Sequence, residues 1–120
     1  MLINLTNHPS SKWSTMQKNA ASIYGEIVDY PFPQVDPQAD EAAISLQAET
    51  ITADLAELHP NAVLCQGEMT LAFALVSRLK QIGIPVLAAC STRCSRETVT
   101  ETGSTVRTSE YVFCRFREYE

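Results

Sequence analysis

The chain alternates between two hydrophobic periods. Short apolar runs closed by Gly, Pro or Asn are separated by longer stretches in which apolar residues recur every three or four positions. The runs are typical of β-strands and the longer stretches of amphipathic helices. The pattern predicts strands at about 2–7, 26–30, 62–67 and 84–91, and helices at about 10–24, 40–58 and 68–83.

The apolar positions also predict which side of each helix is buried. The third helix carries further apolar residues on its other sides, so we expect it to be buried on two sides or to form a subunit interface. The expected buried faces are Trp13, Met16, Ala20 and Tyr24 in the first helix; Ile44, Ala48, Ile51, Leu55 and Leu58 in the second; and Met69, Ala72, Phe73, Val76 and Leu79 in the third.

The C-terminal quarter changes character. Residues 95–119 are rich in Thr, Val and aromatic residues, contain a turn signal at Gly103 and alternate with period two from Tyr111 to Tyr119. This favours a β-hairpin that extends the sheet. Strict alternation would place Tyr111 and Phe113 beside two arginines on one face, where aromatic rings could stack bases. An ordinary half-exposed edge strand has the same pattern.

Strands that alternate with helices indicate right-handed crossovers and a parallel sheet. We therefore expect an α/β fold: one Rossmann-like three-layer domain over residues 1–120 with strand order 2-1-3-4. Helices would cover both faces, and an antiparallel hairpin at about 95–119 would follow.

Composition fits a globular protein, with 45% hydrophobic and 19% charged residues among 120. No apolar run approaches the roughly 20 residues needed to cross a bilayer. The N-terminus has no basic leader, so we expect a cytoplasmic protein without membrane contact. The net charge of −5 argues against a DNA partner. However, cations are absent between Lys18 and Arg78 and gather after Arg78, which leaves room for a compact anionic ligand as well as for plain solvated faces.

Metal and cofactor signatures are missing from the sequence. Cys65, Cys90, Cys94 and Cys114 lack Cys-x-x-Cys spacing, and we interpret them as small buried hydrophobic residues. Neither a glycine-rich dinucleotide fingerprint nor a P-loop occurs. The sequence therefore predicts no cofactor and no metal.

Polar residues follow three of the expected strands. Ligands of open α/β sheets bind beyond the carboxyl ends of the strands, where the strand order reverses. The loops after strands one, three and four would meet there, and the amides that open helices one and three would attract anions. The residues that this topology would gather at one rim are Thr6, Asn7, His8, Ser10, Ser11, Gln66, Gly67, Glu68, Thr70, Ser91, Thr92 and Arg93.

Local structural roles remain open for the same residues. Ser10 or Ser11 can simply cap a helix, and Asn7 can close an Asx-turn before Pro9. His8 can be a solvent-facing turn residue, and Glu68 an acid in a first helical turn. Arg93 is a surface charge if the hairpin turns away from the rim.

Four phrases carry a family resemblance: "NLTNHPSSKW", "YGEIVDYPFPQVDP", "QGEMTLAFALVSRLK" and "YVFCRFREY". Together they resemble small, single-domain CRISPR-associated proteins with the Rossmann-like CARF fold, several of which are ring nucleases of type III systems. The resemblance implies binding of cyclic oligoadenylate across a two-fold homodimer and, in ring nucleases, its metal-independent linearisation. It supplies no catalytic motif that can be placed on this sequence.

Under that resemblance the rim residues take hypothetical roles. Cyclic oligoadenylate carries a 2′-hydroxyl beside each phosphodiester, so the substrate supplies its own nucleophile. Ser10 and Ser11 would hold phosphate, Arg93 would stabilise the developing charge and His8 would transfer a proton. The catalytic candidates are thus His8, Ser11 and Arg93.

Two alternatives stay open. The protein could bind the cyclic nucleotide without cleaving it, as a sensor or sponge. It could instead resemble nucleoside deoxyribosyltransferases, with Glu68 as the nucleophile, although a second acidic partner is not apparent at the rim.

Overall fold

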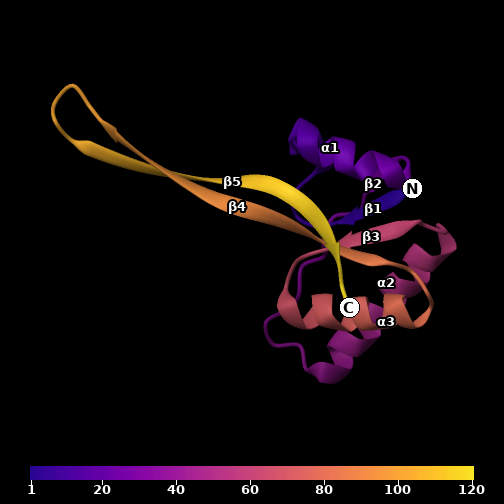
Figure 1. Ribbon diagram of the computed structural model, residues 1–120. Coiled ribbons are helices and arrows are strands. Elements are labelled where there is room, and N and C mark those ends of the chain that lie inside the picture. The colour runs from indigo at the N-terminus through magenta and orange to yellow at the C-terminus, as the bar shows by residue number, and fades with distance from the viewer.

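The computed structural model describes residues 1–120 (Figure 1). It is a mixed α/β domain of five strands and three α-helices, with one short 3₁₀ turn before α1 and another after it. In chain order the elements are β1 (Leu2–Leu5), η1 (Ser10–Lys12), α1 (Thr15–Ala21), η2 (Ser22–Tyr24), β2 (Ile27–Asp29), α2 (Glu41–Glu57), β3 (Ala62–Cys65), α3 (Met69–Gln81), β4 (Val86–Val99) and β5 (Thr105–Glu118).

The strands form one sheet in the order β2-β1-β3-β4-β5. The pairs β1–β2, β1–β3 and β3–β4 are parallel, and β4–β5 is antiparallel. The first four strands therefore keep the neighbours expected from the sequence. The sheet differs from that prediction because the hairpin is not a separate unit after strand four: β4 is itself the first strand of the hairpin, and β5 becomes the fifth strand of the sheet.

Helices cover both faces of the sheet, with α1 on one face and α2 and α3 on the other (Figure 1). On the α2–α3 face, Ile3, Val63 and Val86 pack in a cluster with Leu55 and Leu75 of the helices. On the α1 face, a smaller cluster is built from Leu2, Ala62, Leu64, Leu87, Trp13 and Ala21. The β1 and β3 strands are buried on both sides, which explains their continuous hydrophobicity.

The first helix begins later than the sequence suggested. Residues Ser10–Lys12 form a 3₁₀ turn, and α1 starts at Thr15 with the Ser14 hydroxyl accepting a hydrogen bond from the Gln17 amide. Neither Ser10 nor Ser11 is the helix cap. The buried side of α1 consequently includes Gln17 and Ala21, while Met16 is exposed.

The third helix is rotated relative to the prediction. Leu71, Leu75 and Leu79 face the core, whereas Met69 is 83% exposed and Phe73 75% exposed. The sequence identified both apolar sides but assigned Met69 and Phe73 to the core. The more apolar inner row is made of leucines, and the second row remains uncovered.

The β4–β5 hairpin extends far beyond the body (Figure 1). β3 pairs with β4 only at Val86 and Leu87, whereas β4 and β5 pair along their whole length to Val99–Thr105. We call residues 92–112 the arm; all of them are exposed. The arm raises the radius of gyration to 17.4 Å, where a compact chain of this length has about 14 Å.

A β-bulge lies at the base of the arm. Cys90 pairs with Arg115 and Ser91 with Phe113, so Cys114 is the extra residue. The bulge brings Phe113 and Phe116 to the same face, with ring centroids 4.9 Å apart. The strict alternation predicted from Tyr111 to Tyr119 is therefore wrong, because Arg115 and Arg117 lie on the opposite face from Tyr111 and Phe113.

Candidate functional site

A cavity of about 780 Å³ opens at the carboxyl ends of β1 and β3, where the sequence predicted a site. Its floor and walls come from the β1–η1 loop, the start of α1, the β3–α3 loop and the base of the β4–β5 hairpin. Six of the predicted rim residues line this one cavity: Thr6, Asn7, His8, Gln66, Gly67 and Ser91.

A buried asparagine organises the loop that carries His8. Asn4 is only 1% exposed, and its Nδ2 donates hydrogen bonds to the His8 carbonyl and to Asp29 Oδ1, both at 2.9 Å. The Asn4 Oδ1 accepts from the Thr6 hydroxyl at 2.8 Å. Trp13 Nε1 also donates to the His8 carbonyl, at 3.1 Å. The backbone of His8 is thus fixed from three sides while its side chain is left free for the cavity.

The same loop is closed by Thr6, not by Asn7 as the sequence suggested. The His8 amide donates to Thr6 Oγ1 at 3.1 Å, which is a side-chain turn of the Ser/Thr type. Asn7 is left exposed at the cavity.

Ser10 is engaged elsewhere. Its hydroxyl donates to Asp29 Oδ2 at 3.0 Å and its amide to Asp29 Oδ1 at 3.2 Å. Burial raises the pKa of Asp29, but the hydrogen bonds from Asn4 and Ser10 outweigh it and hold the pKa below the usual value. Asp29 therefore stays ionised and ties the end of β2 to the loop after β1.

Gln66 joins the ends of two strands. Its Oε1 accepts the Ala89 amide at 3.0 Å, at the point where β4 has left β3 and would otherwise lack a partner on that edge. The backbone of the adjacent Gly67 packs directly against the Phe32 ring, and a Cβ at this position would lie 2.5 Å from ring atoms. The close approach that requires glycine is thus to Phe32 within the protein.

Aromatic side chains form the wall opposite the β1–η1 loop. Phe113 is buried and Tyr111 is 74% exposed, and both line the cavity with Trp13. Phe116 supports this wall from behind, 6.1 Å from the Trp13 ring and in edge contact with Phe113. The exposed Tyr111 ring is the surface on which a planar ligand can stack.

The remaining predicted residues lie outside the cavity: Ser10, Ser11, Glu68, Thr70, Thr92 and Arg93. The expected loop after strand four does not exist, because Ser91, Thr92 and Arg93 belong to β4. Thr92 contacts Cys114 on the far face of the hairpin. Arg93 pairs with Tyr111 across the hairpin and donates to Ser109 Oγ at 3.2 Å, so it sits beyond Ser91 on the outward continuation of the cavity.

Glu68 is a helix cap. Its carboxylate accepts the amides of Thr70 and Leu71 and the Thr70 hydroxyl, at 2.7 to 3.1 Å. The hydrogen bond from the Thr70 side chain, with those from the two amides, lowers the pKa of Glu68. The amides at the start of α3 are therefore occupied by the chain's own carboxylate, and the prediction that they are free for an anion is wrong.

This cap gives a stability prediction. A lowered folded-state pKa stabilises the protein above the unfolded value of 4.5, and the contribution is lost as pH falls through the lower folded value. Glu68→Ala is expected to lower the melting temperature at pH 7. Between pH 5 and about pH 3 the melting temperature of the variant should fall less than that of the wild type. Glu101→Ala, which removes an exposed acid from the turn of the arm, is the control. Equal pH dependence in wild type and Glu68→Ala would contradict the capping role.

Three contributors to the site were not anticipated from the sequence: Lys12, Gln17 and Asn4. Lys12 brings the cavity's cation, and Gln17 lines the α1 side. Asn4 could have been noticed in the sequence, because it is the single polar residue inside the apolar run of β1.

No group of three His, Cys, Asp or Glu side chains is placed to hold a metal ion. Cys65 is buried, and burial raises the pKa of its thiol to about 12. The prediction of four buried cysteines is wrong for Cys94 and Cys114, which are exposed on the hairpin. None of the helices is both long and apolar enough to cross a membrane.

The structure places the protein in the class of α/β domains with a ligand-sized cavity where the order of the parallel strands reverses, here between β1 and β3, and it adds a projecting hairpin. The model of the "Uncharacterized protein MJ1673 family" matches residues 1–117, and the chain belongs to this family. No curated protein and no solved structure matches the chain.

Proposed function

We propose that the protein is a CRISPR-associated, Rossmann-like nucleotide-binding protein that holds cyclic oligoadenylate at a homodimer interface, with the rim cavity as the share of the site that each copy contributes, and linearises it. The observation that carries the proposal is the convergence of His8, Gln66, Lys12 and Tyr111 on one cavity of about 780 Å³. Its size is within the range of small-molecule sites. A nucleotide has three parts that match these groups: its phosphate suits the cation, the edge of its base suits the polar groups, and the plane of its base suits the exposed ring.

The binding roles follow from position. Lys12 faces phosphate as the cation of the cavity, and Tyr111 stacks an adenine. The Gln66 amide nitrogen, whose partner oxygen is held by Ala89, donates to phosphate or base. Arg93 lies one step farther out on the hairpin, where the next phosphate of a ring would pass.

The cleavage step uses the substrate's own 2′-hydroxyl. Its oxygen attacks the adjacent phosphorus, the bond to the 5′-oxygen breaks, and a 2′,3′-cyclic phosphate and a 5′-hydroxyl form. His8 takes the 2′-hydroxyl proton as the bond to phosphorus forms and returns this proton to the departing 5′-oxygen as the P–O5′ bond breaks. The backbone of His8 is held by Asn4 and Trp13, so the imidazole is presented from a fixed point. Ser11 lies outside the cavity and takes no part in this step.

The test is incubation with labelled cyclic tetra-adenylate and hexa-adenylate in EDTA, followed by mass analysis. Linear product in stoichiometric excess over protein is expected. Binding without product would leave the sensor or sponge function, and absence of binding to both rings would refute the proposal.

Matched variants identify the site. Lys12→Gln is expected to weaken binding about tenfold, because one charge-assisted contact is worth about 1.5 kcal/mol or more. Lys18→Gln on the exposed side of α1 is the control and should bind as wild type does. His8→Ala is expected to retain binding and lose cleavage by about 100-fold or more. Unchanged cleavage by His8→Ala would remove His8 from the mechanism.

A further inference from the structure

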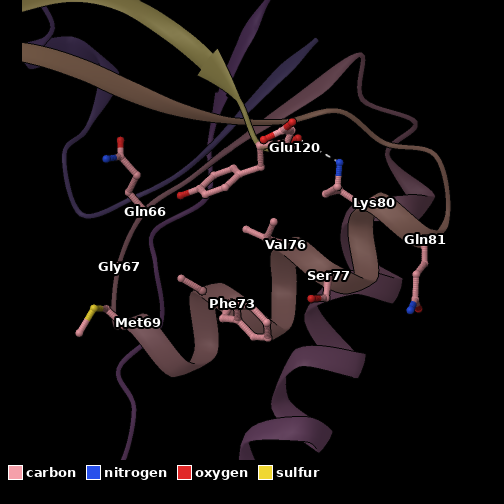
Figure 2. A pocket seen from close by; sticks show the side chains of 11 residues that line it. Gln66, Gly67, Met69, Phe73, Val76, Ser77, Lys80, Gln81 and Glu120 are labelled. Atoms are coloured by element: carbon pink, nitrogen blue, oxygen red, sulfur yellow. Dashed lines mark hydrogen bonds between the residues drawn. The ribbon is translucent and has the colours of Figure 1, made fainter.

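The outer side of α3 is an uncovered apolar groove. Met69, Phe73 and Val76 form its base along the helix, with Gln66 and Gly67 at one end and Lys80 and Gln81 at the other (Figure 2). The groove measures about 870 Å³ and also includes Tyr119 and Glu120 of the C-terminal segment. Its exposed Met and Phe are unusual for a free surface in a small domain.

The arm is the second uncovered structure. Beyond Leu87 neither strand edge of the hairpin is paired with another strand, and both faces of the arm are open to solvent. A two-stranded hairpin alone in water is marginally stable, and its free edges favour association. The arm therefore needs a surface to lie on.

One face of the arm suits the groove. Cross-strand pairing puts Val106 opposite Thr98 and Val112 opposite Thr92, so small and apolar residues share this face. Both valines are exposed. The charged residues of the face are Arg96 and Glu110, and those of the groove are Lys80 and Glu120. Each surface thus offers one cation and one anion to the other.

We propose that two copies of the chain exchange arms, with the arm of each copy lying along the α3 groove of its partner. The interface is isologous: each arm residue that meets a groove residue of the partner is matched by the same contact across the two-fold axis. An arm about 25 Å long and two strands wide covers roughly 250 Å², so two arms and two grooves bury about 1,000 Å², the lower bound of a specific interface. The proposal goes beyond nucleotide binding and requires no ligand.

Complementation of two defective variants tests the exchange. Phe73→Asp places a charge in the groove but leaves the arm intact. In the second variant, Asn-Gly replaces residues 95–109 and joins the cross-strand partners Cys94 and Glu110, leaving the groove intact. Light scattering without ligand should show a wild-type dimer, and each variant should dimerise about thirtyfold more weakly or worse.

The decisive sample is the equimolar mixture. A mixed pair retains one good arm on one good groove, about half of the wild-type interface. At raised protein concentration the mixture is therefore expected to form a dimer that is weaker than the wild type but that neither variant forms alone. Leu46→Asp, on the exposed side of α2, should leave the wild-type dimer unchanged. Circular dichroism checks that each variant is folded.

Three results would overturn the proposal: a monomeric wild type, a dimer that survives either variant, or a mixture that stays monomeric. The second result would identify the alternative: a dimer that survives the arm deletion would indicate a symmetric α3–α3 contact, and one that survives Phe73→Asp an arm–arm contact. These outcomes are independent of nucleotide cleavage, which the oligoadenylate assay measures separately.

Discussion

Phe32→Ala is expected to destabilise the protein by about 3–5 kcal/mol, the range for a buried phenylalanine whose cavity cannot collapse. Phe32 is 5% exposed, belongs to the larger core cluster and lies between Pro31 and Pro33. The two prolines restrict the backbone on either side, so the segment has little freedom to fill the space. Urea denaturation monitored by circular dichroism measures the loss.

Gly67 provides the control for this contact. A methyl group at Gly67 would lie 2.5 Å from the Phe32 ring, so Gly67→Ala alone should cost about 1–3 kcal/mol. In the Phe32→Ala background the same change should cost markedly less, because the ring is gone. Leu46→Ala, on an exposed surface, should stay within about 0.5 kcal/mol of wild type. Additive losses from Phe32→Ala and Gly67→Ala would contradict the packing described.

Asn4→Asp is expected to cost about 3–5 kcal/mol at pH 7, comparable to an uncompensated buried charge. The substitution is nearly isosteric, but it replaces the Nδ2 donor by an oxygen. That oxygen would face Asp29 Oδ1 at 2.9 Å and the His8 carbonyl at 2.9 Å. Two donated hydrogen bonds become two repulsive contacts, and the loop that carries His8 loses its anchor.

The penalty of Asn4→Asp should depend on pH. In the variant, two facing carboxylates raise the folded-state pKa of the pair, so the instability is full above that value and shrinks as the pair gains a proton. In the wild type, the folded pKa of Asp29 is lowered, so its stabilisation is present at neutral pH and is lost only in stronger acid.

Thermal unfolding of both proteins between pH 7 and about pH 4 measures the difference. Asn19→Asp on the surface of α1 is the matched control, and its difference in stability from the wild type should not shrink as the pH falls. A constant difference between wild type and Asn4→Asp would mean that Asn4 does not contact Asp29.

The parallel part of the fold could be predicted from the sequence because its signals are local. The apolar runs of β1 and β3 and the stripe of α2 each identify an element without reference to the rest of the chain. The predicted start of this helix at about residue 40 agrees with the structure, in which Asp40 is the N-cap of α2. The rim location of Thr6, His8 and Gln66 then follows from topology.

Other features depend on contacts that the sequence does not display. The α3 face could not be chosen by hydrophobicity, because its leucine row and its Met69–Phe73 row are both apolar. The end of β4 was misplaced because "CSTRCSRE" contains polar residues that resemble a loop, although β5 pairs with all of them. The sequence leaves Glu68 open as a rim residue, a nucleophile or an acid in the first helical turn; the structure makes it the N-cap of α3.

The single extra residue Cys114 does not itself decide which side chains of the hairpin face the cavity. Its deletion would make Phe113 and Arg115 consecutive opposite Ser91 and Cys90, so Tyr111 and Phe113 would stay on the cavity side. Farther out, removing one rung from both strands would turn every residue beyond it to the other face, whereas removing two rungs would shorten the arm and leave those residues on their faces. Variation in arm length that keeps the two faces of the distal arm must therefore come in steps of two residues on each strand.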